Sequence, residues 1–273
     1  MRRAYVWLAL LPLGACGPAP VEVGTADYAA LGLPARCAPG QKPGRAGEDN
    51  GLSTASGIRL GVRTPRNYDA THAHPLLIVF APAGHGRVRS EQLAGFTRDA
   101  TARGFIVAYA DHRALGRATF EELGRVPEMV AARWCVDERR VHLAGHSDGG
   151  TAAAAVAFLQ TSVLPPAGLV ISAAGIRKED LAQYACPPPM SVMVVHSRDD
   201  RLFPPPAFGV GPAQWWAACN QCGTQMQRPV DSCLEYTGCA GGRRTLYCET
   251  SGPHTQWPAL NGSMLDFLSA VRR

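Results

Sequence analysis

Hydrophobic residues along the chain form short runs separated by longer segments of mixed polarity, and this pattern predicts a sheet covered by helices. Six runs have the length of buried strands: residues 58–62, 76–81, 105–110, 141–144, 169–173 and 191–196. Four segments have helical patterns: residues 91–103, 120–134, 151–164 and 264–271. Because strands that alternate with helices favour parallel pairing, we expect an α/β fold with a mostly parallel central sheet and helices on both faces.

The chain is long enough for one large hydrophobic core. Its 273 residues, of which 46% are hydrophobic, favour a single domain. We place this domain at residues 57–273, because the first strand-like run follows Gly57. Residues 16–56 are rich in Gly, Pro and Ala and lack sustained periodicity, so we expect a tether and then an irregular segment, pinned by Cys37, that leads into the domain.

The first fifteen residues have the pattern of an export signal peptide. Arg2 and Arg3 precede an apolar run at 4–13 that is too short to span a bilayer as a mature helix. The run ends in "LGAC", which resembles the lipobox of bacterial lipoproteins and implies a lipid anchor on Cys16 that attaches the protein to a membrane. The alternative is ordinary cleavage that leaves Cys16 as a free or paired thiol. Both predict export, as a periplasmic or cell-surface lipoprotein or as a secreted protein.

The cysteine content fits export. Of the nine cysteines, eight remain when Cys16 is set aside, and an even number in an oxidising compartment predicts four disulfides. These residues are Cys37, Cys135, Cys186, Cys219, Cys222, Cys233, Cys239 and Cys248. Zinc is the alternative, because Cys219 and Cys222 have C-x-x-C spacing, but one such pair is weak evidence for a metal.

The charged residues give no indication of a nucleic-acid partner. The formal net charge is +5, without runs of basic residues and without basic residues interleaved with aromatic ones. We therefore expect the charges to form a solvated surface.

A serine lies between two glycines where a strand is expected to give way to a helix. The stretch "GHSDG" at 145–149 follows the strand-like run and precedes an alanine-rich helical segment, which is the context of a G-x-S-x-G nucleophile elbow. Ser147 would sit on the sharp turn, where glycines avoid crowding and the helix N-terminus favours negative charge. The alternative is a glycine-rich turn whose serine caps the helix.

A nucleophilic serine needs a base and a carboxylate that orients the base, and hydrolases of this type carry them in the order Ser, Asp, His. Asp199 and Asp200 follow the strand at 191–196, and by position either could serve. His254 comes after both, in a Gly-Pro loop ahead of the last helical segment, where catalytic groups project. This order predicts His254 as the base, the alternative being a surface histidine.

Four stretches carry a resemblance to a known family: "CVDERRVHLAGHSDGG" at 135–150, "VVHSRDDRLFP" at 194–204, "YTGCAGG" at 236–242 and "GPHTQWP" at 252–258. They resemble the secreted polyhydroxybutyrate depolymerase and feruloyl esterase group of α/β-hydrolases, which includes acetylxylan esterases. The resemblance extends from about residue 57 to the C-terminus and implies the α/β-hydrolase fold.

The resemblance also implies roles for individual residues. The second stretch looks like the group's His-Gly-x-x-Asp-x-x-Val-Pro loop, which makes Asp200, four positions after His196, the triad acid. It further implies a disulfide between Cys222 and Cys239 that ties down the segment before His254. The pairing of the other six cysteines stays open.

Two features depart from the group's pattern. In "FAPAGHG" at 80–86, Ala81 and Pro82 stand where the group has His-Gly, and Pro82 has no N–H to donate. An oxyanion hole needs two N–H groups, for which Asp148, after the nucleophile, and Ala83, in this loop, are the candidates. The second departure is one extra residue between the histidine and the tryptophan of "HTQWP".

The residues and the resemblance together predict an exported serine hydrolase of carboxylic esters. Ser147 attacks, His254 transfers the proton, Asp200 orients the imidazole, and no metal or organic cofactor is implied. We expect a monomer acting on a small or oligomeric ester, and the group's substrates include polyhydroxyalkanoates and feruloyl or acetyl esters of plant polysaccharide. The alternatives are an acyltransferase with the same triad and a catalytically weak surface-binding lipoprotein.

Overall fold

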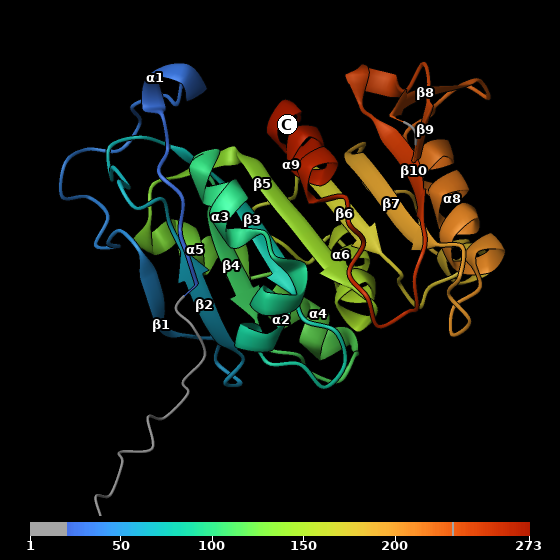
Figure 1. The fold of residues 1–273 in the computed structure, drawn as a ribbon, viewed down its shortest axis with the longest axis horizontal. Coiled ribbons are helices and arrows are strands. Elements are labelled where there is room, and N and C mark those ends of the chain that lie inside the picture. Colours follow the sequence, from blue (N-terminus) through green and yellow to red (C-terminus); the bar gives the residue numbers. More distant parts are fainter. Residues whose placement is uncertain (1–20, 231) are drawn as a thin grey trace, which may run out of the picture.

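The computed structural model describes residues 21–230 and 232–273. The expected signal peptide and Cys16 lie outside the described residues. Within them, ten strands form one sheet in the order β1-β2-β4-β3-β5-β6-β7-β10-β9-β8 (Figure 1). The strands are β1 (Glu48–Ser53), β2 (Arg59–Arg63), β3 (His74–Phe80), β4 (Ile106–Ala110), β5 (Val136–His146), β6 (Gly168–Ser172), β7 (Ser191–Ser197), β8 (Met226–Val230), β9 (Cys233–Tyr236) and β10 (Thr245–Thr250).

The central strands are parallel and the outer ones antiparallel. Strands β4, β3, β5, β6, β7 and β10 pair in parallel. Strands β1 and β2 extend the sheet antiparallel at one edge, and β9 and β8 do so at the other. The carboxyl ends of the parallel strands therefore meet at one edge of the sheet, where loops carry functional groups in α/β folds.

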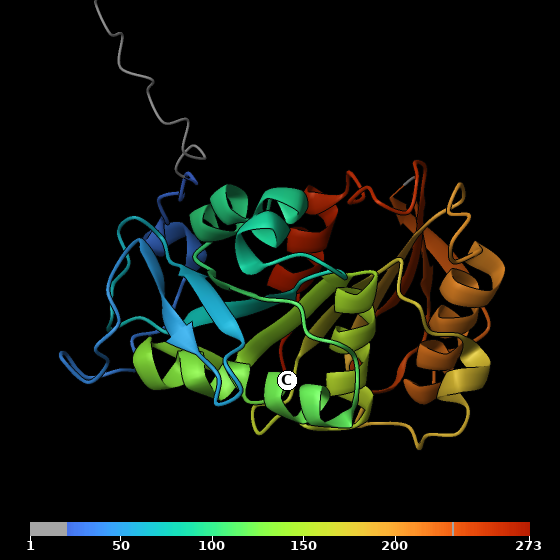
Figure 2. The ribbon, with the colours of Figure 1, turned by 90° about the horizontal axis from the view of Figure 1, so that it is seen from below.

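Helices cover both faces of the sheet, as the pattern predicted. The helices are α1 (Tyr28–Leu31), α2 (Arg87–Ala94), α3 (Thr97–Ala102), α4 (Arg117–Leu123), α5 (Val126–Arg133), α6 (Asp148–Phe158), α7 (Lys178–Leu181), α8 (Gly211–Cys219) and α9 (Asn261–Ala270), with short turns η1 (Pro206–Val210) and η2 (Ala240–Gly242). Figure 2 shows α2, α3 and α9 on one side of the sheet and α4, α5 and α6 on the other. The expected mostly parallel sheet with helices on both faces, in a single domain, is confirmed.

Each face of the sheet has its own hydrophobic core, because successive side chains of a strand point to opposite faces. In β3, Leu76, Ile78 and Phe80 join the core under α5, α6 and α8, whereas Leu77 and Val79 join the core under α2, α3 and α9. All seven residues of β3 are buried. This two-sided burial explains why the parallel strands appear in the sequence as continuous apolar runs.

Two of the expected helices are each divided by a glycine. The segment at 91–103 forms the end of α2 and all of α3, and the break is Gly95, which has a left-handed conformation with φ of 62°. The segment at 120–134 divides between α4 and α5 at Gly124, where a Cβ would lie 2.5 Å from the carbonyl oxygen of Thr161.

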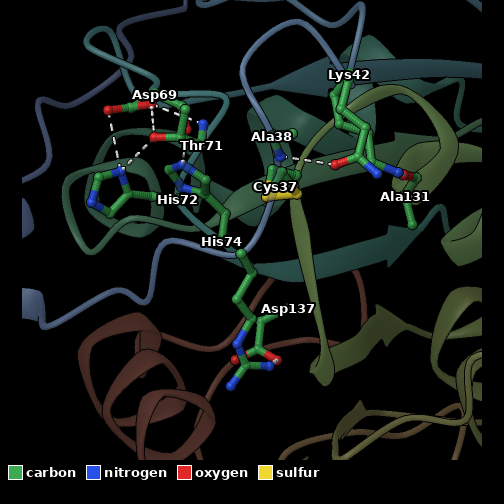
Figure 3. The surroundings of a disulfide bond; sticks show 12 residues. Cys37, Ala38, Lys42, Asp69, Thr71, His72, His74, Ala131 and Asp137 are labelled. Carbon is green, nitrogen blue, oxygen red and sulfur yellow. Dashed lines mark hydrogen bonds and ion pairs between the residues drawn. A yellow bond between two sulfur atoms is a disulfide. The ribbon is translucent and has the colours of Figure 1, made fainter.

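The segment before Gly57 contributes to the sheet, which is a departure from the irregular structure expected there. Residues 48–53 form β1, whose residue Leu52 is buried. An edge strand with one buried side chain has little hydrophobic periodicity, so the pattern did not indicate it. Figure 3 shows how this segment is held: Cys37 is disulfide-bonded to Cys135, and Lys42 Nζ donates a hydrogen bond of 2.6 Å to the Ala131 carbonyl oxygen.

The cysteines of the described residues form four disulfides: Cys37–Cys135, Cys186–Cys219, Cys222–Cys239 and Cys233–Cys248. The Cys222–Cys239 pair is present as the resemblance implied, and Cys219 and Cys222 belong to different disulfides. Such a set is typical of proteins exported to an oxidising compartment. Among the described residues, no helix has the length and apolar character needed to cross a membrane.

The position of the Cys222–Cys239 disulfide differs from the expectation that it ties down the segment before His254. Cys239 precedes the start of β10, whereas His254 follows the end of this strand. The nearer bond is Cys233–Cys248, which joins directly opposed residues of β9 and β10. The expectation failed because Cys222 and Cys239 lie near the start of β10, where Cys222 Sγ is 3.5 Å from Thr245 Oγ1, whereas His254 follows the opposite end of the strand.

Candidate active site

Ser147 lies on a strained turn at the carboxyl end of the central strand β5. It connects His146, the last residue of β5, to Asp148, the first residue of α6. Its backbone has φ of 56° and ψ of −123°, a conformation that costs a non-glycine residue energy and that surrounding structure must maintain. The Ser147 N–H donates a hydrogen bond of 2.9 Å to the Ser172 carbonyl oxygen at the end of β6. The turn therefore presents the serine hydroxyl above the sheet edge.

The glycines around Ser147 are required by close contacts. A Cβ at Gly145 would lie 2.1 Å from the Gly149 carbonyl oxygen, and one at Gly149 would lie 2.1 Å from the Phe80 carbonyl oxygen. A Cβ at Gly150 would lie 2.7 Å from the carbonyl oxygen of Ser172. Strand and helix approach each other here more closely than any side chain allows, which accounts for the G-x-S-x-G-G sequence.

Ser147, His254 and Asp200 form one chain of hydrogen bonds. The Ser147 Oγ lies 2.9 Å from His254 Nε2, and His254 Nδ1 donates to Asp200 Oδ2 at 2.7 Å. Asp200 lies in the turn after β7, and His254 lies in the loop between β10 and α9. An ionised carboxylate such as Asp200 can only accept hydrogen bonds, so the proton of the neutral imidazole lies on Nδ1. Nε2 is then unprotonated and can accept the proton of the serine hydroxyl.

The Asp200 carboxylate is buried but well provided with donors. Its Oδ1 accepts hydrogen bonds of 2.9 Å from the N–H groups of Leu202 and Phe203. Burial alone would raise the pKa of Asp200, but the Phe203 N–H and the His254 ring outweigh it and hold the pKa below its usual value. Asp200 is therefore ionised at neutral pH, as a group that stabilises an imidazolium must be.

Asp199 has a different environment from its neighbour. It is exposed, and its Oδ2 accepts a hydrogen bond of 2.9 Å from the Gly252 N–H, two residues before His254. The sequence position of the two aspartates did not separate them. The structure places only Asp200 in contact with the imidazole of His254.

Two further histidines support the hydrogen-bonded chain. His146 Nε2 donates to the His254 carbonyl oxygen at 2.6 Å, while His146 Nδ1 accepts from the Ser172 hydroxyl at 2.9 Å. Burial, ahead of all other causes, lowers the pKa of His146 to about 4, so its ring is neutral. His196 Nε2 donates to the Phe203 carbonyl oxygen at 2.7 Å and lies 3.3 Å from Asp200 Oδ2. These rings fix the backbone of His254 and the turn of Asp200.

A hollow of about 220 Å³ opens above Ser147 and His254. One side of it is formed by the loop after β3, through Pro82, Ala83 and His85, and Leu93 and Leu202 add apolar surface. The N–H of Asp148 is at the first position of α6, where a helix leaves its N–H groups without internal partners. Within the described part of the chain, neither this N–H nor that of Ala83 has a hydrogen-bond acceptor. Ala83 lines the hollow itself, and Asp148 follows the lining residue Ser147.

His112 was not among the residues predicted from the sequence. It follows β4 at the same edge of the sheet, and its Nε2 donates to Asp148 Oδ2 at 3.0 Å. Its backbone N–H donates to the His85 carbonyl oxygen at 3.1 Å. His112 thus joins the loop of Ala83 to the turn of Ser147. Its position two residues after the end of a parallel strand is the one signal that could have indicated it.

A mostly parallel sheet whose central strand ends in a serine on a sharp turn before a helix defines the α/β-hydrolase fold. No family model and no curated protein matches the sequence of the chain. Solved structures do match its fold. An acetyl xylan esterase from Aspergillus awamori has a TM-score of 0.62 at 11% identity, covering 82% of this chain and 99% of the esterase.

Two other solved structures are similar to a comparable degree. A truncated carbohydrate esterase from gut microbiota has a TM-score of 0.58 at 13% identity over 84% of this chain and 97% of its own. An S-formylglutathione hydrolase from Staphylococcus aureus has a TM-score of 0.57 at 14% identity over 83% of this chain and 98% of its own. At such identities the similarity establishes a shared fold.

Proposed function

We propose that the protein is a serine hydrolase that cleaves carboxylic esters. The observation that carries this proposal is the chain of hydrogen bonds from the Ser147 hydroxyl through His254 to the ionised Asp200. The open hollow above the serine and the two free N–H groups beside it supply the remaining parts that acyl transfer requires. The esterases among the proteins of the same fold are consistent with it.

In the first half of the reaction, the Ser147 oxygen attacks the ester carbonyl carbon while His254 Nε2 takes the hydroxyl proton. The negative charge that forms on the carbonyl oxygen is stabilised by the N–H groups of Asp148 and Ala83. The carbon–oxygen bond to the alcohol then breaks, and the imidazolium gives its proton to the leaving alkoxide. The products are a free alcohol and an acyl group on Ser147.

In the second half, a water molecule takes the place of the serine hydroxyl. His254 removes a proton from the water, whose oxygen attacks the acyl carbon, and the bond to Ser147 breaks as the serine oxygen regains a proton from His254. The carboxylic acid leaves. Asp200 stays ionised throughout and stabilises the imidazolium in both halves.

The candidate substrates are polyhydroxyalkanoate oligomers and feruloyl or acetyl esters of plant polysaccharide. We further propose that the protein is exported as a monomer, with Cys16 as the site of a lipid anchor. The four disulfides support the exported location. Release of the protein from membranes by a Cys16→Ser substitution would support the anchor, and unchanged fractionation would contradict it.

Replacement of Ser147 by alanine tests the proposed activity. We expect the Ser147→Ala variant to fold normally and to lose about 10⁴-fold or more in kcat toward p-nitrophenyl butyrate, because the members of such a triad act as a unit. The measurement is steady-state hydrolysis by the purified, disulfide-bonded protein, with circular dichroism to verify folding. A folded variant with near-normal hydrolysis, or a wild-type protein that hydrolyses no short ester, would contradict the proposal.

A further inference from the structure

A second and larger hollow adjoins the one that contains Ser147. It has a volume of about 470 Å³, and its charged and polarisable lining comes from Arg59, Arg113, His85, His112 and Asp111. We call it the arginine hollow. The two hollows share His85, and consecutive residues of the loop after β3 line one or both of them. A substrate bound at the serine can therefore extend into the arginine hollow past this loop.

The space in the arginine hollow is maintained by glycines. Gly57, Gly84 and Gly86 belong to its wall. A Cβ at Gly84 would have no atom within 4 Å, so this position faces open space. Gly57 and Gly84 have φ of 86° and 73°, which disfavours any larger residue at either point.

Asp111 is the single carboxylate among the lining residues, and its charge is already compensated. Its Oδ2 accepts a hydrogen bond of 2.7 Å from Arg59 Nε, and its Oδ1 accepts one of 2.7 Å from the backbone N–H of Arg87. The Nη1 atom of Arg87 also lies 3.7 Å from Oδ1. Burial would raise the pKa of Asp111, but these donors outweigh it and hold the pKa below its usual value. Two guanidinium groups thus face one carboxylate.

Arg113 adds a cation whose hydrogen-bond partner is a neutral oxygen. Its Nη2 donates at 3.0 Å to the Ser56 carbonyl, which cannot cancel a charge. The Glu122 carboxylate does not line the hollow and accepts a hydrogen bond of 2.7 Å from the Ser56 N–H. Burial would raise the pKa of Glu122, but hydrogen bonds from Ser56 and Thr54 and the charge of Arg113 outweigh it, so Glu122 balances part of that charge from outside the hollow. The hollow is therefore electropositive.

We propose that the arginine hollow binds a free carboxylate on the substrate, so that the preferred substrates are esters carrying a second, ionised carboxyl group. This inference rests on the proposed ester hydrolysis. Guanidinium groups bind carboxylates through paired hydrogen bonds in a fixed plane. Arg59 and Arg113 both line the arginine hollow, which is wide enough for a carboxylate. The carboxylate belongs to the acid part or to the alcohol part of the ester, and the experiment below distinguishes them.

The test compares kcat/KM for charged and neutral esters of matched shape. In the acid-part arm, mono-p-nitrophenyl glutarate is compared with p-nitrophenyl methyl glutarate. In the alcohol-part arm, 4-acetoxybenzoate is compared with its methyl ester. We expect the charged ester to be preferred about tenfold in one arm, and the preference to decrease as salt is added, because the site is open to solvent.

Variants connect this preference to the arginines. We expect Arg113→Gln to reduce the charged-to-neutral ratio about fivefold, Arg59→Gln/Arg113→Gln to abolish the preference, and Arg113→Lys to retain part of it. The matched control is Arg36→Gln, which also removes an arginine paired with an aspartate, Asp137 at 3.3 Å. Asp137 lies near the start of β5, whereas Ser147 follows its end. The two are roughly 20 Å apart along the sheet, because the part of β5 between them pairs with only His74 to Phe80 of β3. This control should leave the ratio unchanged.

Each outcome has a separate meaning. Hydrolysis of the neutral esters with no charged preference in either arm, or a preference that the double variant keeps, would overturn the arginine hollow and leave the proposed function intact. If no ester is hydrolysed, the proposed function fails, and monomethyl glutarate is titrated into the protein by calorimetry. Binding that the double variant loses would then support the hollow, whereas absent or unchanged binding would overturn it.

Discussion

At the scale of single residues, adjacent positions in the chain acquire different chemistry from their surroundings. Asp199 and Asp200 have the same side chain, yet Asp200 is buried against His254 and two backbone N–H groups, whereas Asp199 is exposed and holds Gly252. The direction of each side chain from the turn after β7 determines the difference. Only the buried carboxylate can fix the tautomer of the imidazole.

This difference predicts unequal effects of removing each charge. Asp200→Asn should lower kcat on the order of 10³-fold to 10⁴-fold, because an amide favours the wrong tautomer of His254. Asp199→Asn should lower it less than about threefold, since the amide oxygen can still accept from the Gly252 N–H. Steady-state hydrolysis of p-nitrophenyl butyrate by both folded variants measures this, and the opposite ranking would assign the acid to Asp199.

His112 is predicted to act through the groups it joins. We expect His112→Ala to lower kcat about tenfold with KM changed less than about twofold, because the Asp148 and Ala83 N–H groups lose their fixed spacing and act mainly in the transition state. His112→Gln, which can still donate to Asp148, should recover part of the loss. The neutral p-nitrophenyl butyrate is the appropriate substrate. A change confined to KM, or equal losses in both variants, would show that His112 has no positioning role.

How far the candidate site could be predicted depends on the range of the contacts involved. Ser147 and His254 follow strands in a recognisable order that indicated both, whereas this order left Asp199 and Asp200 open and only the family resemblance selected Asp200. The bonds from His112 to Asp148 and from His146 to the His254 carbonyl oxygen join residues 36 and 108 positions apart. No local pattern specifies such contacts, which arise when several strand ends meet at one edge of the sheet.

At the scale of elements, the buried strands from β2 to β7 were predictable, whereas the last part of the sheet was not, including β10, whose first four residues are buried. Strands β2 to β7 appear as apolar runs because both of their faces are covered. Strand β8 is exposed at every position, and β9 alternates over only four residues, so hydrophobicity gives little signal for either. Two disulfides, Cys222–Cys239 and Cys233–Cys248, add covalent links to this region.

The two disulfides beside β10 are predicted to differ in their effect on catalysis. Each closes a loop of 15 or 17 residues, so in the chain-entropy model each contributes about 3 kcal/mol to the free energy of unfolding. Cys222→Ser/Cys239→Ser should lower stability but change kcat less than about twofold, because this bond lies before β10. Cys233→Ala/Cys248→Ala should lower both, because Cys248 is six residues before His254.

Chemical denaturation and ester hydrolysis measure these two effects on the same preparations. Peptide mapping of the non-reduced variants verifies that the three remaining disulfides are unchanged. A large loss of kcat in the Cys222→Ser/Cys239→Ser protein would restore the view that this bond positions the catalytic histidine.

At the scale of the whole molecule, buried neutral histidines make stability sensitive to acid. His142 is fully buried, and neither ring nitrogen has a hydrogen-bond partner among the described residues. Burial, and then the charge of Arg140, lower the pKa of His142 to about 3. Because the unfolded chain takes up a proton near pH 6.5 and the folded chain does not, the free energy of unfolding must fall as the pH drops below this value.

This linkage predicts a measurable pH profile. Between pH 6.5 and 4.5, His142 should reduce the free energy of unfolding by up to about 1.4 kcal/mol per pH unit. His142→Leu should have a shallower profile over the same range, since leucine does not titrate and leaves no unpaired polar atom in the core. Urea denaturation at several pH values measures both slopes. Identical slopes would show that the folded protein takes up the proton at His142.

The Cys37–Cys135 disulfide gives the molecule a distinctive covalent topology. The two cysteines are 98 positions apart, and the enclosed segment includes β1 to β4, the loop of Ala83 and His112. This part of the backbone is a closed ring, which the preceding residues join at Cys37 and the following residues leave at Cys135. A single cut by a protease anywhere within the ring would open it without releasing a fragment, so one side of the active-site hollow would remain covalently joined to the strand that carries Ser147.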